Sequence, residues 1–189
     1  GTSAITDAIP SVRNIITDVK KNGDAAIVKY TNEFDRVNAS SIAELKVSQE
    51  EVDAAINSCP KELLAALEFA AKRIESYHKK QMPKDFDYID EDGVRLGNLW
   101  KPVKVAGLYV PGGTATYPSS VLMNAIPARV AGVKELVMVT PAPEGKMNPA
   151  VLAAAKIAGV TEIYKIGGAQ AIAALALGDN SIPTVDKIV

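Results

Sequence analysis

Three short segments that follow apolar runs carry the residues best suited to chemistry in this sequence. They are Tyr109-Val110-Pro111-Gly112-Gly113, Thr140-Pro141-Ala142-Pro143 and Gly167-Gly168-Ala169-Gln170. Paired glycines lack a Cβ atom and adopt positive φ, so a ligand can approach backbone N–H groups closely. Two segments also lead toward expected helix starts, where free N–H groups and the helix dipole favour anions. Tyr109 and Gln170 add a phenol and an amide, and both are therefore candidate ligand contacts.

Each of these features also has a purely structural interpretation. Paired glycines after a strand often form only a tight turn, and the dinucleotide-binding fingerprint G-x-G-x-x-G is absent. Tyr109 could pack at a strand end with its hydroxyl at the rim, and Gln170 could cap its own helix. The pattern alone does not decide between two interpretations, a nucleotide or phosphate site and a set of simple turns.

The remaining reactive side chains do not form a catalytic or metal-binding set. The sequence has one His and one Cys, whereas a self-contained zinc site needs about four ligands. We interpret His78 as a hydrogen-bonded packing residue and Cys59 as an inert, buried thiol. Asp90-Glu91-Asp92 is typical of a solvated hairpin tip, with a weak cation site as the alternative. The sequence therefore predicts no catalytic residue and no metal ligand of its own.

Composition excludes several classes of protein. Of 189 residues, 48% are hydrophobic and 23% charged, which is typical of a globular chain and not of a disordered one. Lys and Arg number 21 against 22 for Asp and Glu, so no basic surplus exists for a nucleic acid. No apolar run reaches the roughly 20 residues that span a bilayer, so no membrane partner is expected. A single Cys favours a reducing compartment, and we expect the cytoplasm.

Residues 102–189 alternate between apolar runs and helical patterns. Expected strands and helices are Lys104–Val110, Ser119–Ala131, Glu135–Thr140, Pro149–Ala158, Glu162–Ile166, Ala169–Leu177 and a last strand from Lys187. Such alternation predicts an α/β fold, with a Rossmann-like parallel sheet and helices on both faces. The three segments that carry the candidate residues then gather at the carboxyl edge of this sheet. Because the last strand only begins at Lys187, we expect the sequence to be a piece of a longer protein with incomplete domains.

Residues 1–101 form a helix-rich segment with a short strand and a hairpin, part of a first α/β domain. A helix is expected from Pro10 to about Tyr30, with an interruption at Asn22-Gly23-Asp24. Ser48 and Glu51 have the spacing of a capping box that opens a helix. The other expected elements are a strand at Ala43–Val47, a helix from Pro60 with an inner stripe at Leu63, Leu67, Ala70, Ile74 and Tyr77, and a β-hairpin at Phe86–Leu99.

Longer motifs around the three segments resemble those of the histidinol dehydrogenase family. The segments are Gly107-Leu108-Tyr109-Val110-Pro111-Gly112-Gly113 with Tyr117-Pro118-Ser119-Ser120-Val121-Leu122-Met123-Asn124, Ile126-Pro127-Ala128-Arg129-Val130-Ala131-Gly132-Val133, and Ile166-Gly167-Gly168-Ala169-Gln170-Ala171-Ile172-Ala173-Ala174-Leu175-Ala176. Asn22-Gly23-Asp24-Ala25-Ala26 and Phe34-Asp35 fit the same family. The resemblance covers nearly the whole sequence.

The resemblance implies part of an NAD-dependent, zinc-requiring enzyme of histidine biosynthesis. Such an enzyme oxidises L-histidinol through the aldehyde to L-histidine in two hydride transfers, as an intertwined homodimer. Tyr109 and Gln170 match family residues that contact NAD. The family's zinc ligands, substrate contacts and Glu-His acid/base pair lie further along, so we expect this chain alone to be inactive. A related dehydrogenase of another small alcohol and a non-catalytic binding module remain alternatives.

Overall fold

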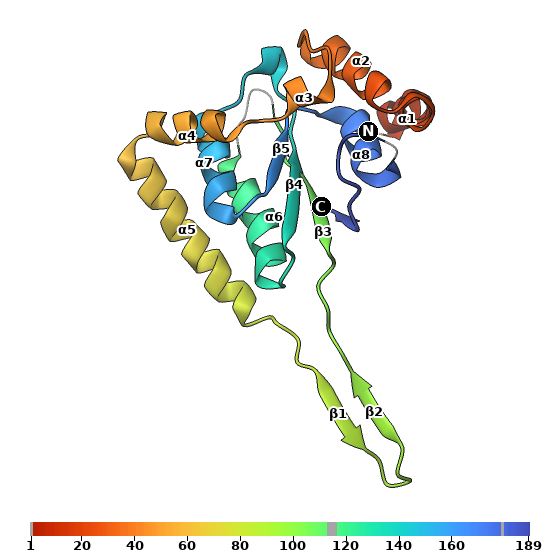
Figure 1. The fold of residues 1–189 in the computed structure, drawn as a ribbon, viewed down its shortest axis with the longest axis vertical. Helices are drawn as coiled ribbons and strands as arrows, with labels where there is room; N and C mark the ends of the chain where they lie inside the picture. Colours follow the sequence, from red (N-terminus) through yellow and green to blue (C-terminus); the bar gives the residue numbers. More distant parts are fainter. Residues whose placement is uncertain (1, 113–116, 179) are drawn as a thin grey trace.

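A four-stranded parallel sheet lies at the centre of the protein (Figure 1). The computed structural model describes residues 2–112, 117–178 and 180–189. The strands stand in the order β5-β4-β3-β6, and every neighbouring pair is parallel. Their bounds are β3 (Val105–Tyr109), β4 (Glu135–Val139), β5 (Glu162–Tyr164) and β6 (Lys187–Ile188). The expected Rossmann-like α/β architecture is confirmed.

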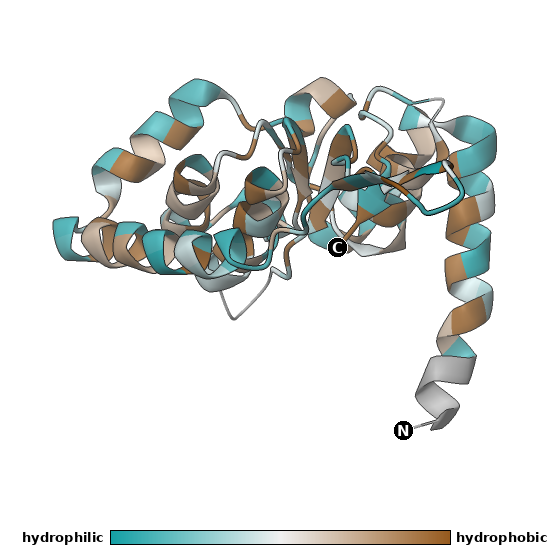
Figure 2. Cartoon of the chain, turned by 90° about the horizontal axis from the view of Figure 1, so that it is seen from below, coloured by the Kyte–Doolittle hydropathy of each residue, from teal (hydrophilic) through white to brown (hydrophobic). Residues whose placement is uncertain are grey.

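Neighbouring residues of β4 point to opposite faces of the sheet and enter two separate cores. Leu136 and Met138 pack toward α6 (Pro118–Val130) and α7 (Pro149–Ala158), whereas Val137 and Val139 pack toward α8 (Gly168–Leu177). These four side chains are buried, and only Glu135, the first residue of β4, is exposed. Burial on both faces explains why this strand is a continuous apolar run. Figure 2 shows hydrophobic residues gathered where the helices meet the sheet.

The helices of the first half extend both cores. They are α1 (Thr2–Asn22), α2 (Asp24–Asp35), α3 (Ile42–Leu45), α4 (Gln49–Ser58) and α5 (Lys61–Lys79). Helices α1 and α2 pack on α8, α4 packs on α7, and α5 packs on both α6 and α7. Ile27 of α2 is buried in the core on the α8 side of the sheet, and Leu67 of α5 is buried in the core on the α6 and α7 side. Residues of both halves of the sequence therefore share the same buried surfaces.

Helix α1 starts earlier than the sequence predicts. It begins at Thr2, so Pro10 lies inside the helix and does not open it. Proline removes one backbone hydrogen bond from a helix, and the exposed surroundings of Pro10 let water replace the lost bond. The break expected at Asn22-Gly23-Asp24 is confirmed, because α1 ends at Asn22 and α2 begins at Asp24. Across the described ranges, no helix combines the length and apolarity that crossing a membrane requires.

The connection before α4 covers the outer edge of β5. The prediction of a strand at Ala43–Val47 is wrong for the first part of that range. This part belongs to the helical turn α3, in which Ile42 and Leu45 are buried. Only Lys46 forms an antiparallel bridge, opposite Tyr164. Ser48 then caps α4 by accepting a hydrogen bond from the Glu51 N–H at 3.1 Å, as expected.

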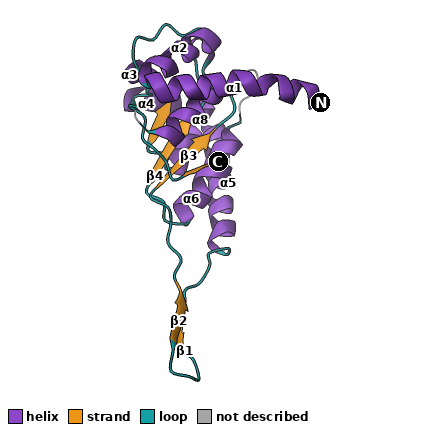
Figure 3. Ribbon diagram, turned by 90° about the vertical axis from the view of Figure 1, so that its right-hand side faces the viewer, coloured by secondary structure: helices purple, strands orange, loops and turns teal. Residues whose placement is uncertain are grey.

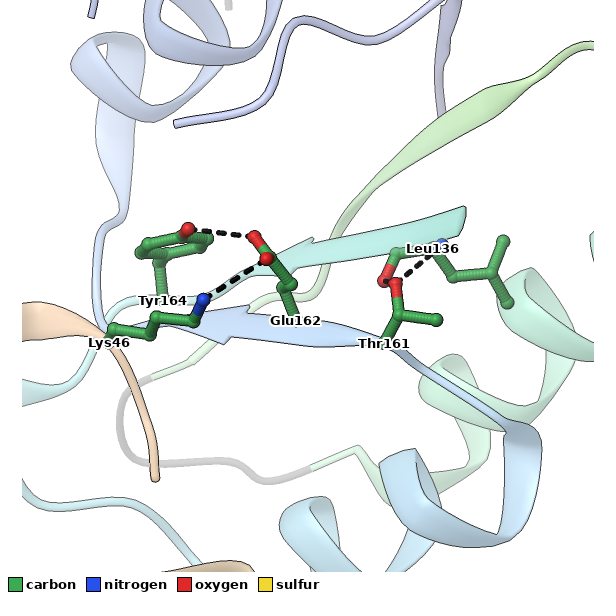
Figure 4. A network of polar contacts seen from close by, with 5 residues as sticks. All are labelled: Lys46, Leu136, Thr161, Glu162 and Tyr164. Atoms are coloured by element: carbon green, nitrogen blue, oxygen red, sulfur yellow. Dashed lines mark hydrogen bonds and ion pairs between the residues drawn. The ribbon is translucent and has the colours of Figure 1, made fainter. Parts of the chain in front are cut away.

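A network of polar side chains fastens this connection to the sheet (Figure 4). The Lys46 ammonium lies 3.0 Å from Glu162 Oε1, and the Tyr164 hydroxyl donates to Glu162 Oε2 at 2.8 Å. Burial, and then the Glu162 carboxylate, raise the pKa of Tyr164 above its usual value. The phenol therefore stays protonated and remains a donor. An edge strand that is covered in this way cannot pair with another chain along the covered part.

The β-hairpin projects away from the body of the protein (Figure 3). It consists of β1 (Phe86–Ile89) and β2 (Arg95–Asn98), as predicted, and its strand residues are all exposed. Asp90 closes the tip by accepting hydrogen bonds from the N–H groups of Asp92 and Val94. The carboxylates at the tip thus organise a turn, in agreement with the first of the two interpretations.

Candidate functional site

The hydroxyl of Tyr109 reaches the start of helix α8. Tyr109 is the last residue of β3, and its phenolic oxygen accepts a hydrogen bond from the Gly168 N–H at 3.0 Å. Parallel strands place their carboxyl ends at one edge, so the ends of β3 and β5 lie at the same edge, on either side of β4. One of the first N–H groups of α8 is therefore held by a side chain from another strand.

The amide of Gln170 lies on the other side of the same glycine. Its side chain is 1% exposed, and its Oε1 atom is buried without a hydrogen-bond partner. A Cβ atom on Gly168 would lie 2.6 Å from this oxygen, and Gly168 has φ +64°. Any side chain at position 168 would thus be strained and would displace the amide. Tyr109 and Gln170, which the sequence singled out separately, meet at Gly168.

A buried polar oxygen without a partner is rare in a folded protein, because no hydrogen bond offsets the free energy lost when water is removed from it. The simpler interpretation, in which Gln170 caps its own helix, is not supported. Gly167 occupies the capping position, and no side chain bonds there. The Oε1 atom of Gln170 is thus a buried acceptor without a hydrogen-bond partner among the described residues.

Pro141 holds the three loops of this edge together. A Cβ atom on Gly112 would lie 2.4 Å from the Pro141 carbonyl oxygen, and one on Gly167 would lie 2.3 Å from Pro141 Cγ. Only glycine permits such close approach at either position. The loops that follow β3, β4 and β5 are therefore in contact, as the sequence predicted. Gly113, the partner of Gly112 in the sequence motif, lies outside the described residues.

The sequence did not indicate the two charged residues near this edge, Lys146 and Asp35. Lys146 lines a cavity of about 50 Å³ together with Gly112, Pro141 and the start of α7. That volume is well below the roughly 300 Å³ of an enclosed ligand pocket, so a larger ligand would lie across the open edge. Asp35, the last residue of α2, faces Ala142 of the same edge. Burial raises the pKa of Asp35, and the Ala142 N–H opposes the increase.

A larger cavity and the side chains of His78 and Cys59 lie away from the carboxyl edge of the sheet. A cavity of about 420 Å³ lies beside β5 and α4, and its lining includes neither Tyr109 nor Gln170. His78 lies in the last turn of α5, where its Nδ1 is 2.7 Å from Gln81 Oε1. It is a hydrogen-bonded residue, as expected, while Cys59 is half-buried and free. Within residues 2–112, 117–178 and 180–189, no cluster of His, Cys, Asp or Glu could hold a metal ion.

Comparison with known proteins identifies the family. The family model described as histidinol dehydrogenase matches residues 1–189. The chain belongs to the histidinol dehydrogenase family. Histidinol dehydrogenase from Agrobacterium fabrum is 55% identical over 183 residues, which are 97% of this chain and 42% of that protein. The protein of the same name from Rhizobium meliloti is 57% identical over 178 residues, 94% of this chain and 41% of its own length.

A solved structure of the family has the same fold. The crystal structure of histidinol dehydrogenase from Elizabethkingia anophelis superposes with a TM-score of 0.89 at 37% identity. The match covers 96% of this chain and 41% of that one. The chain thus spans about two-fifths of the length of the histidinol dehydrogenases it matches.

Proposed function

We propose that this chain is the nucleotide-binding part of an NAD-dependent, zinc-requiring enzyme that oxidises L-histidinol to L-histidine. The observation that carries the proposal is the meeting of Tyr109 and Gln170 at Gly168. Family membership supports the reaction, and the position at the carboxyl edge of a parallel sheet supports a nucleotide. The same family resemblance supports a cytoplasmic homodimer as the working form of the complete protein.

The residues of this edge fit a dinucleotide. Gln170 Oε1 is buried and lacks a donor among the described residues, so we propose that NAD binding moves the covering residues and that an amide or hydroxyl of NAD supplies the donor. Tyr109 stands at the start of α8, where its hydroxyl is bonded to the Gly168 N–H, and helix starts at such an edge favour phosphate groups. When bound, NAD accepts the hydride, while the residues of this chain hold and orient it.

The residues of this chain do not fit zinc. A catalytic zinc site needs three protein ligands, and His78 and Cys59 do not gather with carboxylates into such a set in the part of the chain that the structure describes. Alcohol oxidation also needs a base for the hydroxyl proton and an electrophile for the developing alkoxide. These groups must come from other parts of the complete protein. Residues 1–101 and 102–189 contribute to the same two buried cores, so we propose that they form one α/β unit of it and not two successive domains.

The test is reduction of NAD with L-histidinol and added zinc. We expect turnover from the complete protein and none from the 189-residue chain, and clear turnover by the shorter chain would refute its assigned role. In the complete protein, Gln170→Ala should raise the KM for NAD about fivefold, since one hydrogen bond contributes about 1 kcal/mol. Gln49→Ala, on the surface of α4, is the matched control. Equal kinetics for the two variants would remove Gln170 from the site.

A further inference from the structure

Lys146 is the exposed cation of the loops at the carboxyl edge of the sheet. Residues 110–112, 140–148 and 165–167, which follow β3, β4 and β5, contain two basic residues, Lys146 and Lys165. Lys165 lies 2.6 Å from Glu51 Oε1, and its side chain is only 15% exposed, so an ion pair already holds it. The Lys146 side chain is 81% exposed, and its ammonium lies 3.4 Å from the Glu144 carboxylate. Because exposed ion pairs contribute little to stability, Lys146 can exchange this partner for an anionic group of a ligand.

A second cation approaches the same carboxylate from the end of α2. Arg36 Nη2 lies 4.0 Å from Glu144 Oε1, whereas Lys146 Nζ lies 3.4 Å from Glu144 Oε2. Each oxygen of one carboxylate therefore faces a different cation, and the three side chains carry two positive charges and one negative charge. Asp35 adjoins Arg36 in the sequence, but its Oδ2 atom is buried and is not presented to a ligand. The exposed groups of this cluster thus leave positive charge in excess.

Glu144 lies between the two cations in a strained backbone conformation. It belongs to the turn η1 (Pro143–Gly145) and has φ +56°. Non-glycine residues rarely adopt positive φ, and strain of this kind is typical of functional sites. Glycine or asparagine would form the same turn with less strain. The turn alone therefore does not require a glutamate at this position.

Lys146 is joined to the nucleotide edge through Pro141. Lys146, Gly112 and Pro141 line the same small cavity. Pro141 is also the residue on which Gly167 packs, just before the start of α8, since a Cβ atom on Gly167 would lie 2.3 Å from Pro141 Cγ. A ligand that extends from Gln170 along this edge across Pro141 therefore meets Lys146.

A dinucleotide carries its negative charge on the diphosphate between its two nucleosides. We propose that Lys146 and Arg36 bind this diphosphate, and that Glu144 keeps the two cations together until a phosphate group takes its place. Lysine and arginine are the usual partners of phosphate in proteins. This inference rests on the proposed function for the identity of the ligand.

The Kd for NADH, from a fluorescence titration of the complete protein, tests the proposal. Lys146→Ala should raise the Kd about fivefold, the upper range for one exposed charge pair, and Arg36→Ala should act in the same direction. Lys146→Arg should stay within about twofold of wild type, because it keeps the charge. Glu144→Gln should lower the Kd about twofold, since no carboxylate then competes with the phosphate. Ion pairs that serve only stability predict no gain in affinity for Glu144→Gln, and that result would overturn the proposal.

Salt and a matched control separate charge from general damage. Salt screens exposed charges, so the Kd of wild type should rise with ionic strength, and that of Lys146→Ala should rise less. Lys134→Ala, an exposed lysine just before β4 at the opposite edge of the sheet, is the control. Equal Kd values for Lys146→Ala and Lys134→Ala, or equal salt dependence for Lys146→Ala and wild type, would overturn the subsite.

A wild-type protein that does not bind NADH would refute the proposed function. A titration with inorganic pyrophosphate then decides the subsite separately. The subsite stands if wild type binds pyrophosphate and Lys146→Ala binds it more weakly, and it falls if wild type does not bind pyrophosphate or if the two bind it equally.

Discussion

Adding one methyl group at Gly167 should disrupt the packing of the loops at the carboxyl edge of the sheet. In Gly167→Ala, the new Cβ atom would lie 2.3 Å from Pro141 Cγ and 3.0 Å from Pro141 Cα. Carbon atoms in contact prefer about 3.5–4.0 Å, and a proline ring cannot rotate away. Gly167 has φ −119°, which any residue adopts, so the penalty is steric. We expect a loss of about 3 kcal/mol, the upper end for overpacking.

Thermal unfolding of the 189-residue chain measures this loss. For a chain of this length, about 3 kcal/mol corresponds to a decrease in Tm of about 6–12 °C. Gly145→Ala is the control in the same loop region, because its new Cβ atom would have its nearest neighbour at 3.9 Å. Gly145 has φ +72°, and an alanine with this backbone conformation lowers the unfolding free energy by only about 1 kcal/mol. A Gly167→Ala variant as stable as Gly145→Ala would refute the close packing of these loops on Pro141.

Two further predictions concern the surface of the chain. Hydrogen bonds, led by that from Lys29, lower the pKa of Asp18 to about 2. Asp18 thus stabilises the fold above its unfolded pKa of about 3.9 and loses this effect as pH falls through the folded value. Circular dichroism should show Asp18→Asn with a lower Tm than wild type at neutral pH and the same Tm near pH 2; a constant difference would contradict this. Replacing both Tyr88 and Leu96 of the exposed hairpin by Ser should change the unfolding free energy of the protein body by less than about 0.5 kcal/mol. A larger loss in a urea titration would mean that the hairpin packs on the body.

The second half of the sequence was predicted almost to the residue. Helix α7 has the expected bounds, Pro149–Ala158, and each strand begins within one residue of its expected start. Runs buried on both sheet faces leave a strong apolar signal, and Asn148 and Gly159 mark the helix ends. Local chemistry and tertiary packing agree here, so the pattern was sufficient.

The first half was predicted less well, and its two clearest deviations lie at exposed ends of helices, where little packing acts on the side chains. Pro10 is a helix-start signal that the structure places inside α1. Tyr77 continues the helical spacing of the inner stripe of α5, yet it is 62% exposed, because the end of α5 extends beyond α6 and α7. That expectation was wrong for Tyr77, while Leu67 is buried as predicted.

At the site, the sequence predicted the loops but not their contacts. Parallel topology was enough to bring Tyr109 and Gln170 to one edge. The role of Pro141 depends on distances between loops, which no spacing in the sequence reveals. The free Oε1 of Gln170 is likewise a property of the packed structure.

The most direct measurement is a crystal structure of the complete protein soaked with NAD. We expect the dinucleotide to lie across the carboxyl edge of the sheet, with the Gln170 amide oxygen accepting a hydrogen bond from it and the Tyr109 ring in contact. NAD bound away from both residues, with Gln170 Oε1 still without a donor, would contradict the account.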